Sequence, residues 1–309
     1  MLPFRLIYHE AYDLNFGDHV FPSQKYRLIR ARLLREGIAL HEDFEEPDPA
    51  PEEDLLLVHT PEWVNKLKTG TLTCQDILRL EVPYSRQMVH AFFLAAGGTT
   101  LAARLALRDG IGLNIGGGFH HAFPDHGEGF CAVNDIAIAL RRLQKDGLVE
   151  RAMVLDCDVH QGNGTAAIFA GDESVFTISI HQLNNYPSVK PPSTIDLDLA
   201  DGATGQEYLD RLRDPYLTAL AVFRPQLLLY VAGADPYYED QLGGLCLTIE
   251  GLLARDRLVL EAALQRRVPV AVVCAGGYAM QLPDIVTIHA NTAHAAQEAI
   301  CESGWHGRA

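Results

Sequence analysis

The segment that most constrains the fold is the short, mostly apolar run at residues 151–155, which leads directly into DCDVHQGNG at residues 156–164. A short apolar run without polar alternation is typical of a strand buried on both faces of a parallel sheet. In open α/β sheets, ligand-binding groups lie just beyond the carboxyl ends of such strands. Asp158 and His160 are two residues apart, so an extended backbone directs both side chains to the same side. They predict half of a metal site.

The rest of the chain alternates between strand patterns and helix patterns. Surface loops are expected at residues 41–54 and 70–88, and a helix is expected to begin after Thr60, with Pro61 in its first position. This alternation predicts an α/β fold with a mostly parallel sheet flanked by helices. No repeat or composition break divides the chain, so we expect a single domain over residues 1–309. The other predicted strands are 4–9, 55–58, 111–115, 174–180, 227–232 and 268–274, and the other predicted helices are 23–37 (capped by Ser23), 89–107, 134–144, 205–222 and 250–266.

Composition and charge narrow the class of protein. The chain of 309 residues is 48% hydrophobic, enough for a large core, and its net charge of −15 argues against a nucleic-acid-binding surface. The six cysteines show no CxxC spacing, and Cys157, Cys246 and Cys274 lie in apolar or strand-like surroundings typical of buried free thiols. With no secretory signal pattern and no apolar run of membrane-spanning length, we expect a cytoplasmic protein in a reducing compartment.

Unusual polar groups follow four of the predicted strands. They are GGGFHH (116–121), DCDVHQGNG (156–164), GADP (233–236) and AGGY (275–278). Each cluster by itself has an ordinary structural explanation, such as a helix cap or a turn. Because the carboxyl ends of parallel strands share one edge of a sheet, we expect all four clusters to meet there.

Together the clusters supply the parts of a hydrolytic metal site. A catalytic zinc site needs three protein ligands and an open position for water, and Asp158, His160 and Asp235 provide such a set. The metal would polarise the scissile carbonyl and lower the pKa of its water. His120 and His121 would be the proton-transfer pair, because imidazole titrates near neutral pH.

Three further residues fit around that core of the site. Tyr278 follows two glycines and can donate its hydroxyl group to a developing oxyanion. Asp156 and Asn163 fit as hydrogen-bond partners for the far ring nitrogens of the histidines.

With this set of residues the chain resembles the zinc-dependent histone deacetylase family of the arginase/deacetylase superfamily. The resemblance rests on five motifs, in this order: GGGFHHAFPDHGEGFCAVND, DCDVHQGNG, ISIH, GADPYYEDQLGG and AGGY. It extends over about residues 4–295 and implies the arginase/deacetylase fold. The forms GGGFHH, HQGNG and DQLGG are most similar to the class IV branch and its bacterial relatives.

The resemblance implies a catalytic role for several residues. It implies His121 as the general base and acid, His120 as its electrostatic partner and Tyr278 as the activator of the carbonyl. It also implies that one zinc ion, or Fe²⁺ in its place, is bound by Asp158, His160 and Asp235.

The resemblance further implies a tunnel for acyl-lysine and a structural potassium ion. The tunnel would be lined by Gly129, Phe130 and Tyr186. The potassium site would be formed by Asp156, Asp158, His160, Ser179 and Ile180. The expected substrate is an acetylated or long-chain fatty-acylated lysine in a peptide or protein.

Two departures from the class I pattern change what we expect. Class I enzymes have Asp at the position of Asn163, so a reduced charge behind His121 predicts a lower pKa for that imidazole than in class I. The acidic residue that holds the substrate backbone in class I lies in a rim loop, and residues 70–88 are too different to identify it.

Three other functions compete with this interpretation. A two-manganese ureohydrolase on the same fold needs extra carboxylates where this chain has Gly162 and Gly233, which argues against it. A catalytically inactive binding scaffold predicts the loss of a ligand, histidine or tyrosine, and all are present. Hydrolysis of small acetylated amines such as acetylpolyamines stays open, although no acidic gatekeeper is identifiable.

Overall fold

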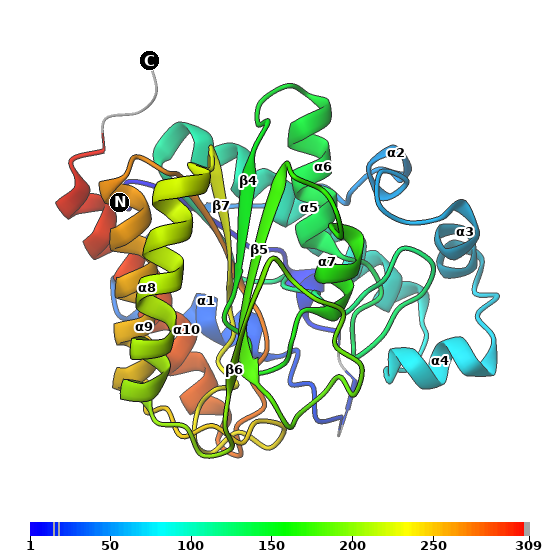
Figure 1. The fold of residues 1–309 in the computed structure, drawn as a ribbon. Helices are drawn as coiled ribbons and strands as arrows, with labels where there is room; N and C mark the ends of the chain where they lie inside the picture. The colour runs from blue at the N-terminus through cyan, green and yellow to red at the C-terminus, as the bar shows by residue number, and fades with distance from the viewer. Residues whose placement is uncertain (15, 18, 306–309) are drawn as a thin grey trace.

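One parallel sheet of eight strands runs through the middle of the structure, a computed structural model that describes residues 1–14, 16–17 and 19–305 (Figure 1). The strand order is β2-β1-β3-β8-β7-β4-β5-β6, and every pairing between neighbouring strands is parallel. The predicted α/β fold with a parallel sheet is therefore confirmed. The strands are β1 (Arg5–Ile7), β2 (Phe44–Glu45), β3 (Ile111–Asn114), β4 (Ala152–Asp156), β5 (Val175–Gln182), β6 (Ile195–Leu199), β7 (Leu227–Ala232) and β8 (Val270–Cys274).

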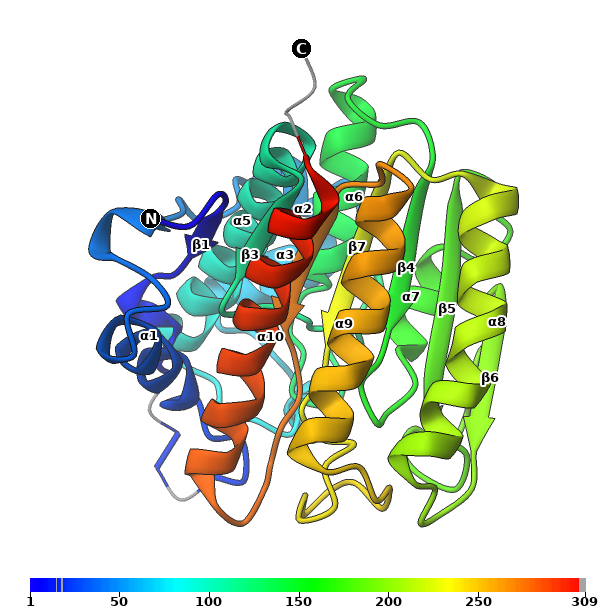
Figure 2. The same ribbon diagram turned by 90° about the vertical axis from the view of Figure 1, so that its left-hand side faces the viewer.

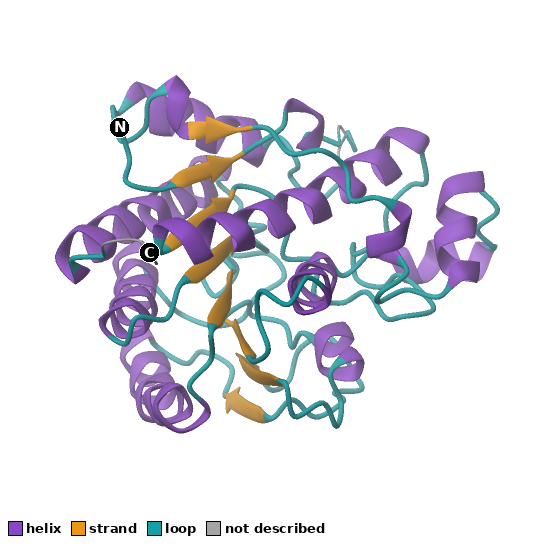
Figure 3. Cartoon of the chain, turned by 90° about the horizontal axis from the view of Figure 1, so that it is seen from above, coloured by secondary structure: helices purple, strands orange, loops and turns teal. Residues whose placement is uncertain are grey.

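Helices cover both faces of this sheet. The group α8, α9 and α10 lies on one face, with α1 packed on α10, and α5, α6 and α7 lie on the other (Figures 1 and 2). The view in Figure 3 shows the strands between these two layers. The helices are α1 (Lys25–Arg35), α2 (Glu52–Leu55), α3 (Pro61–Thr69), α4 (Cys74–Leu80), α5 (Arg86–Asp109), α6 (Asp135–Lys145), α7 (Asn163–Ile168), α8 (Gly205–Phe223), α9 (Ile249–Gln265) and α10 (Leu282–Ser303), with short 3₁₀ turns at Glu10–Tyr12 and His41–Asp43.

The four central strands are apolar because helices cover both of their faces. Every residue of β3, β4, β7 and β8 is buried, which matches the continuous apolar runs in the sequence. Their parallel register places Asp156 beside Val231, and Ala232 beside Cys274. The carboxyl ends of these strands therefore lie side by side.

The predicted helix starts at Thr60 and residue 134 are confirmed, and the predicted cap at Ser23 is wrong. Thr60 caps α3 by accepting from the backbone N–H of Trp63, and Asn134 caps α6 by accepting from the N–H of Ala137. Ser23, however, does not cap α1, which begins at Lys25 after Gln24. The Ser23 hydroxyl instead donates to Asp13 and accepts from the backbone N–H of Leu14, so the neighbouring loop uses it.

The predicted strand at residues 55–58 is also wrong. The acidic segment before it opens α2, and residues 56–58 continue as a turn. Three acidic residues in the first turn of α2 favour a helix over a strand here, because their negative charges complement the helix dipole. Asp54 is fixed there by an ion pair of 3.0 Å with Arg142 of α6.

The predicted loop at 70–88 contains a helix, α4. Thr73 and Asp76 form a capping box: the Thr73 hydroxyl accepts from the N–H of Asp76, and the Asp76 carboxylate accepts from the N–H of Thr73 at 2.8 Å. Four further elements were left unpredicted, among them the short helix α7 that follows the metal-facing loop. The edge strand β2 has only two residues, β6 alternates apolar and acidic residues in IDLDL, and α10 is rich in Ala, Thr and His.

Among the described residues, one helix, α5, is long and apolar enough to cross a membrane, but 67% of its most apolar 18-residue stretch is buried inside the protein. It is a core helix, in agreement with the prediction of no membrane span. Of the three cysteines expected to be buried, Cys157 and Cys274 are, whereas Cys246 is exposed because it lies in the loop before α9 rather than in a strand.

Candidate metal centre and active site

The four polar clusters all follow the four central strands of the sheet. In the order β3-β8-β7-β4 these strands are direct neighbours, so their carboxyl ends bring GGGFHH, AGGY, GADP and DCDVHQGNG to one edge. This is the convergence that the sequence predicts.

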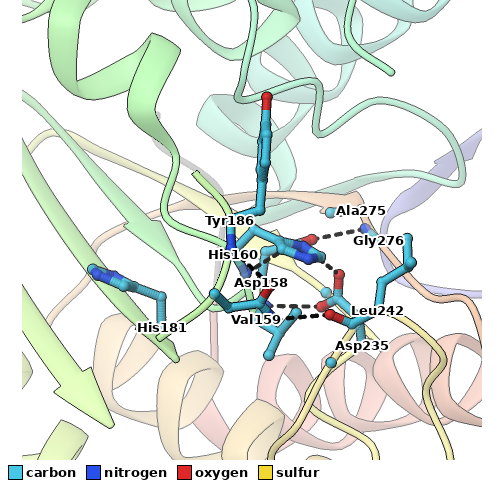
Figure 4. A network of polar contacts seen from close by, with 12 residues as sticks. Asp158, Val159, His160, His181, Tyr186, Asp235, Leu242, Ala275 and Gly276 are labelled. Atoms are coloured by element: carbon cyan, nitrogen blue, oxygen red, sulfur yellow. Dashed lines mark hydrogen bonds and ion pairs between the residues drawn. The ribbon is translucent and has the colours of Figure 1, made fainter. Parts of the chain in front are cut away.

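Asp158, His160 and Asp235 form the centre of the site. All three are buried, and one potential ligand atom of each lies within 4.8 Å of the others. His160 Nδ1 lies 3.0 Å from Asp158 Oδ1 and 3.4 Å from Asp235 Oδ2 (Figure 4). The imidazole therefore presents Nδ1 to both carboxylates, and a cation between the three atoms would have two oxygen ligands and one nitrogen ligand.

The chemistry of this set fits a divalent cation. Asp235 Oδ2 is buried and makes no hydrogen bond within the described residues. Burial and the facing Asp158 carboxylate raise the pKa of Asp235 to about 7. A second oxygen ligand for the cation is available on Asp158. Its Oδ2 atom also accepts a hydrogen bond from the backbone N–H of Gly276 at 3.0 Å. Two buried carboxylates and an imidazole are ligands of zinc and of similar transition metals.

The surrounding glycines leave room for these carboxylates and for no others. A Cβ atom at Gly276 would lie 2.0 Å from Asp235 Oδ2 and 2.4 Å from Asp158 Oδ2. At Gly162 and Gly233, where a two-metal ureohydrolase would need carboxylates, a Cβ would meet Asp156 Oδ2 at 2.3 Å and the Asp158 Cα at 2.6 Å. Among the described residues only one group of potential ligands is found, which fits a centre with a single metal.

His120 and His121 lie beside the metal-facing set and have opposite electrostatic environments. His120 Nδ1 lies 2.6 Å from Asp156 Oδ2, and its Nε2 lies 3.0 Å from His121 Nε2. Although burial opposes it, the charges of Asp156 and Asp158 raise the pKa of His120 to about 9. Burial, together with the positive charges of His120 and His160, holds the pKa of His121 well below its usual range. His120 is therefore the charged member of the pair and His121 the neutral one.

Asn163 holds the other side of the His121 ring. Asn163 Oδ1 accepts from His121 Nδ1 at 2.7 Å, which is the partnership that the sequence predicts. This hydrogen bond raises the pKa of His121, so burial and the neighbouring charges are what lower it. The expectation that the pKa of His121 is lower here than in class I enzymes stays a prediction.

Tyr278 reaches the site from the loop after β8. Its backbone N–H donates to the buried Asp240 carboxylate at 2.6 Å, and its carbonyl accepts from Gln241 Nε2 at 2.8 Å. Its ring centroid lies 6.5 Å from that of His160. Burial, with Asp158 and Asp235 nearby, raises the pKa of the Tyr278 hydroxyl well above its usual value, so this group is a hydrogen-bond donor at neutral pH.

A cavity of about 190 Å³ leads to these groups from the surface. Its wall residues include the three predicted for the tunnel, and its floor includes His121 and His160. The Tyr186 ring stands at 90° to that of His121 with centroids 4.9 Å apart, and the Phe130 ring lies 5.8 Å from that of Tyr278. The cavity is lined by Glu81, His121, Gly129, Phe130, His160, Asn185, Tyr186, Leu242 and Tyr278.

Gly129 and Phe130 are the central residues of a tight turn. Both have positive φ, 51° and 67°, and the flanking Glu128 and Cys131 exchange two backbone hydrogen bonds of 3.1 and 2.9 Å. Phe130 is an L-residue in a left-handed conformation, which needs support from its surroundings. The support comes from α4, because the carbonyls of Arg79 and Leu80 accept from the N–H groups of Gly129 and Phe130.

The five residues predicted for potassium do not lie on one element. Asp156 ends β4, Ser179 and Ile180 lie on β5 with Ser179 beside Asp156 in the strand register, and Asp158 and His160 belong to the metal-facing set itself. The Ser179 hydroxyl lies 2.9 Å from His181 Nδ1. The His181 side chain points away from the metal-facing set (Figure 4).

Three charged residues at the site went unpredicted. Glu81 lines the mouth of the cavity, Asp240 fixes the backbone of Tyr278, and Glu128 accepts from both Asn163 and Tyr186. Asp240 and Glu128 stand inside motifs noted in the sequence, DQLGG and GEGF, so a charged residue within a glycine turn was the available signal. Glu81 had no signal, because its position depends on the unpredicted end of α4.

A parallel α/β sheet that carries a buried Asp-His-Asp set beside a histidine pair defines a metal-dependent hydrolase of the deacetylase class. The histone deacetylase domain family matches residues 19–293, and the chain belongs to this family.

Individual relatives agree with this assignment. An uncharacterized protein of Picosynechococcus sp. is 42% identical over 296 residues, which cover 96% of this chain and 99% of that protein. Histone deacetylase 2 of Arabidopsis thaliana is 32% identical, with 88% of this chain and 74% of that protein covered. A probable deacetylase of Methanothermobacter thermautotrophicus is also 32% identical, with coverage of 88% and 85%.

Solved structures show the same fold. The HD domain of HDA15 superposes with a TM-score of 0.80 at 23% identity, covering 96% of this chain and 89% of that domain. A histone deacetylase homologue in complex with SAHA gives a TM-score of 0.78 at 24% identity, with coverage of 98% and 84%.

Proposed function

We propose that this protein is a zinc-dependent amidohydrolase that removes acyl groups from the side-chain amine of lysine. The observation that carries the proposal is that one cavity ends at a buried Asp-His-Asp set, a His-His pair of opposite charge states and a tyrosine hydroxyl. The cavity walls formed by Phe130 and Tyr186 suit the apolar stem of an acylated lysine.

Asp158, His160 and Asp235 would hold the cation, which when bound polarises the acyl carbonyl and lowers the pKa of a water molecule. His121, neutral at its buried position, takes the proton of the attacking water at Nε2 and returns it to the amine as the amide C–N bond breaks. The charged His120 and the Tyr278 hydroxyl face the negative charge that develops on the carbonyl oxygen. Fe²⁺ in place of zinc, and a structural potassium ion near Asp156 and Ser179, are parts of the same proposal.

The size of the cavity bears on the acyl group. A volume of about 190 Å³ is below the range of roughly 300–1,000 Å³ found for larger ligands, which favours a lysine stem with a short acyl chain. The similarity of the motifs to class IV deacetylases favours substrates with long fatty-acyl chains. Such chains would require the walls of the cavity to move apart. Lysine peptides with acyl chains of two to sixteen carbons test this directly. Rates that fall with chain length support deacetylation, and rates that rise support removal of fatty acids.

A second candidate, hydrolysis of small acetylated amines, is favoured by one observation. Glu81, an exposed acidic residue, is part of the cavity lining, and its negative charge would attract a second amine of such a substrate. Acetylpolyamines are therefore tested beside the peptides, with the variant Glu81→Gln. A loss of activity in this variant that is confined to the polyamines would select the second candidate. A zinc-loaded protein that hydrolyses none of these substrates would instead favour an inactive scaffold.

A further inference from the structure

Glu128 is a charged residue beside the catalytic groups that the proposed reaction does not use. It directly precedes the tight turn at Gly129 and Phe130, and the paired backbone hydrogen bonds between Glu128 and Cys131 fix its direction. Its side chain is largely shielded, with 23% of its surface exposed. One carboxylate oxygen, Oε1, accepts from Asn163 Nδ2 at 2.8 Å and from the Tyr186 hydroxyl at 2.9 Å, and Oε2 lies 3.4 Å from His126 Nε2.

A carboxylate at this position determines which way the Asn163 amide points. An ionised carboxylate can only accept hydrogen bonds, so Asn163 must direct its NH₂ group to Glu128. The Asn163 oxygen is then the atom that faces His121 Nδ1, at 2.7 Å. His121 must therefore carry its hydrogen on Nδ1, which leaves Nε2 without one.

The hydrogen-bond chain that starts at Glu128 and runs through Asn163, His121 and His120 also has a carboxylate at its other end. Asp156 is also a carboxylate, so His120 donates to it from Nδ1 at 2.6 Å. Between the two carboxylates lies the contact of 3.0 Å between the Nε2 atoms of His120 and His121. Because the Nε2 of His121 carries no hydrogen, His120 donates from its own Nε2 as well. Its ring is then protonated on both nitrogens, in agreement with its raised pKa of about 9.

Resting on the proposed function, we infer that Glu128 is a positioning residue for the hydrolysis: its carboxylate fixes the Asn163 amide and thereby the tautomer of His121. An aspartate at position 163 would place a negative charge directly beside His121 Nδ1. Glu128 supplies this charge instead from one residue further along the hydrogen-bond chain. It also holds Tyr186 against the His121 ring, whose centroid is 4.9 Å away. Hydrogen bonds from His126, Tyr186 and Asn163 keep the pKa of Glu128 below its usual range, so the group is ionised at neutral pH.

The test is a set of three variants built on these two residues. In Glu128→Gln the side chain keeps its size but can donate as well as accept, so Asn163 is free to turn over and the tautomer of His121 is no longer fixed. In Asn163→Asp two carboxylates face each other across the 2.8 Å contact with Glu128. In the double variant Glu128→Gln/Asn163→Asp, the glutamine amide donates to the new aspartate, which accepts directly from His121.

We expect each single variant to lower kcat at least about tenfold, with KM and bound zinc unchanged, and the double variant to recover most of that loss. The remote variant Glu173→Gln, which changes an exposed glutamate in the same way, should have wild-type kcat. Losses that add up in the double variant would overturn the inference. A wild-type kcat in Glu128→Gln would do the same.

A second measurement separates this inference from the proposed function. The ¹⁵N chemical shifts of the histidine rings in the zinc-loaded protein report which nitrogen of His121 carries hydrogen, whether or not a substrate is turned over. We expect hydrogen on Nδ1 in the wild type and in the double variant, and a mixture of tautomers in Glu128→Gln. The same spectrum in all three proteins would refute the role of Glu128, even if the enzyme is active. If the expected spectra appear in a protein that hydrolyses no amide, the proposed function fails and the role of Glu128 in positioning His121 stands.

Discussion

At Gly276 the backbone passes so close to the metal-facing carboxylates that any side chain would displace them. The predicted Cβ contacts of 2.0 Å with Asp235 Oδ2 and 2.4 Å with Asp158 Oδ2 are far below a normal contact distance. We expect Gly276→Ala to lose most of its bound metal and its activity while the protein still folds. The matched control is Gly251→Ala in α9, where the nearest atom to the new Cβ is 3.6 Å away. Metal analysis after dialysis distinguishes the two, and full metal occupancy in Gly276→Ala would contradict the assignment.

The Tyr278 hydroxyl gives a second prediction for a single residue. Removing it in Tyr278→Phe leaves the ring packing and the backbone hydrogen bonds to Asp240 and Gln241 in place. We expect kcat to fall by about 10²–10³, the usual effect of losing one oxyanion donor, with zinc still bound. Steady-state kinetics and metal content are measured together. Loss of zinc in this variant would show that the tyrosine supports the metal rather than the carbonyl.

At the scale of elements, α4 links the stability of a short helix to the shape of the cavity. Its last carbonyls hold the strained Phe130 turn, and its first turn depends on the capping box of Thr73 and Asp76. We expect Thr73→Ala to destabilise α4 by about 1 kcal/mol and to raise KM more than it lowers kcat. Backbone amide hydrogen exchange at Gly129 and Phe130 should become faster as α4 is destabilised. The cap variant Thr248→Ala, at the start of α9, should change stability without changing KM.

His59 ties α6 to the loop after β3 and predicts how stability depends on pH. Its Nδ1 donates to the Phe123 carbonyl and its Nε2 accepts from the N–H of Asn134, which requires a neutral ring. Burial lowers the pKa of His59 to about 4, whereas an unfolded chain protonates it near 6.5. The folded state is therefore fully stabilised above pH 6.5 and loses roughly 3 kcal/mol as pH falls toward 4. The variant His59→Gln should show a shallower loss in denaturant unfolding between pH 7 and 4.5, and an equal slope would contradict this assignment.

The elements that could be predicted are those whose signals are local. Apolar runs identified β3, β4, β7 and β8, and Thr60 with Pro61 after it marked the start of α3. Several failures depend on neighbours distant in the sequence, although the capping box of α4 was a local signal that was missed. The strand β2 exists because two residues pair with β1, and the ion pair of Asp54 with Arg142 on α6 holds α2 where a strand was predicted. A similar distinction applies to the site: the predicted ligands and catalytic residues lie inside strand-end motifs, whereas Glu81 is placed by the end of α4.

At the scale of the whole molecule, the buried carboxylates make folding and metal binding interdependent. A cation that binds only the folded state adds about 2.7 kcal/mol of stability when its concentration is 100 times its Kd. We therefore expect chelation to lower the melting temperature and one equivalent of zinc to restore it. The variant Asp158→Asn, which lacks one of the two facing carboxylates, should melt at a temperature that chelator barely changes. Stabilisation that continues to a second equivalent would contradict a single-metal centre.

The position of the site across four central strands also determines when it can exist during folding. Val159 and Asp235, joined by a hydrogen bond, are 76 residues apart, and Asp158 and Gly276 are 118 residues apart. No short segment of the chain contains the whole ligand set, so metal cannot serve as the nucleus around which a local piece folds. The ion must arrive after β4 and β7, whose ends carry the ligands, have paired, and contacts of such long range form late and slowly. Under the proposed function, metal supply would therefore control how much of the folded protein is active in a cell, whereas it would not speed the assembly of the sheet.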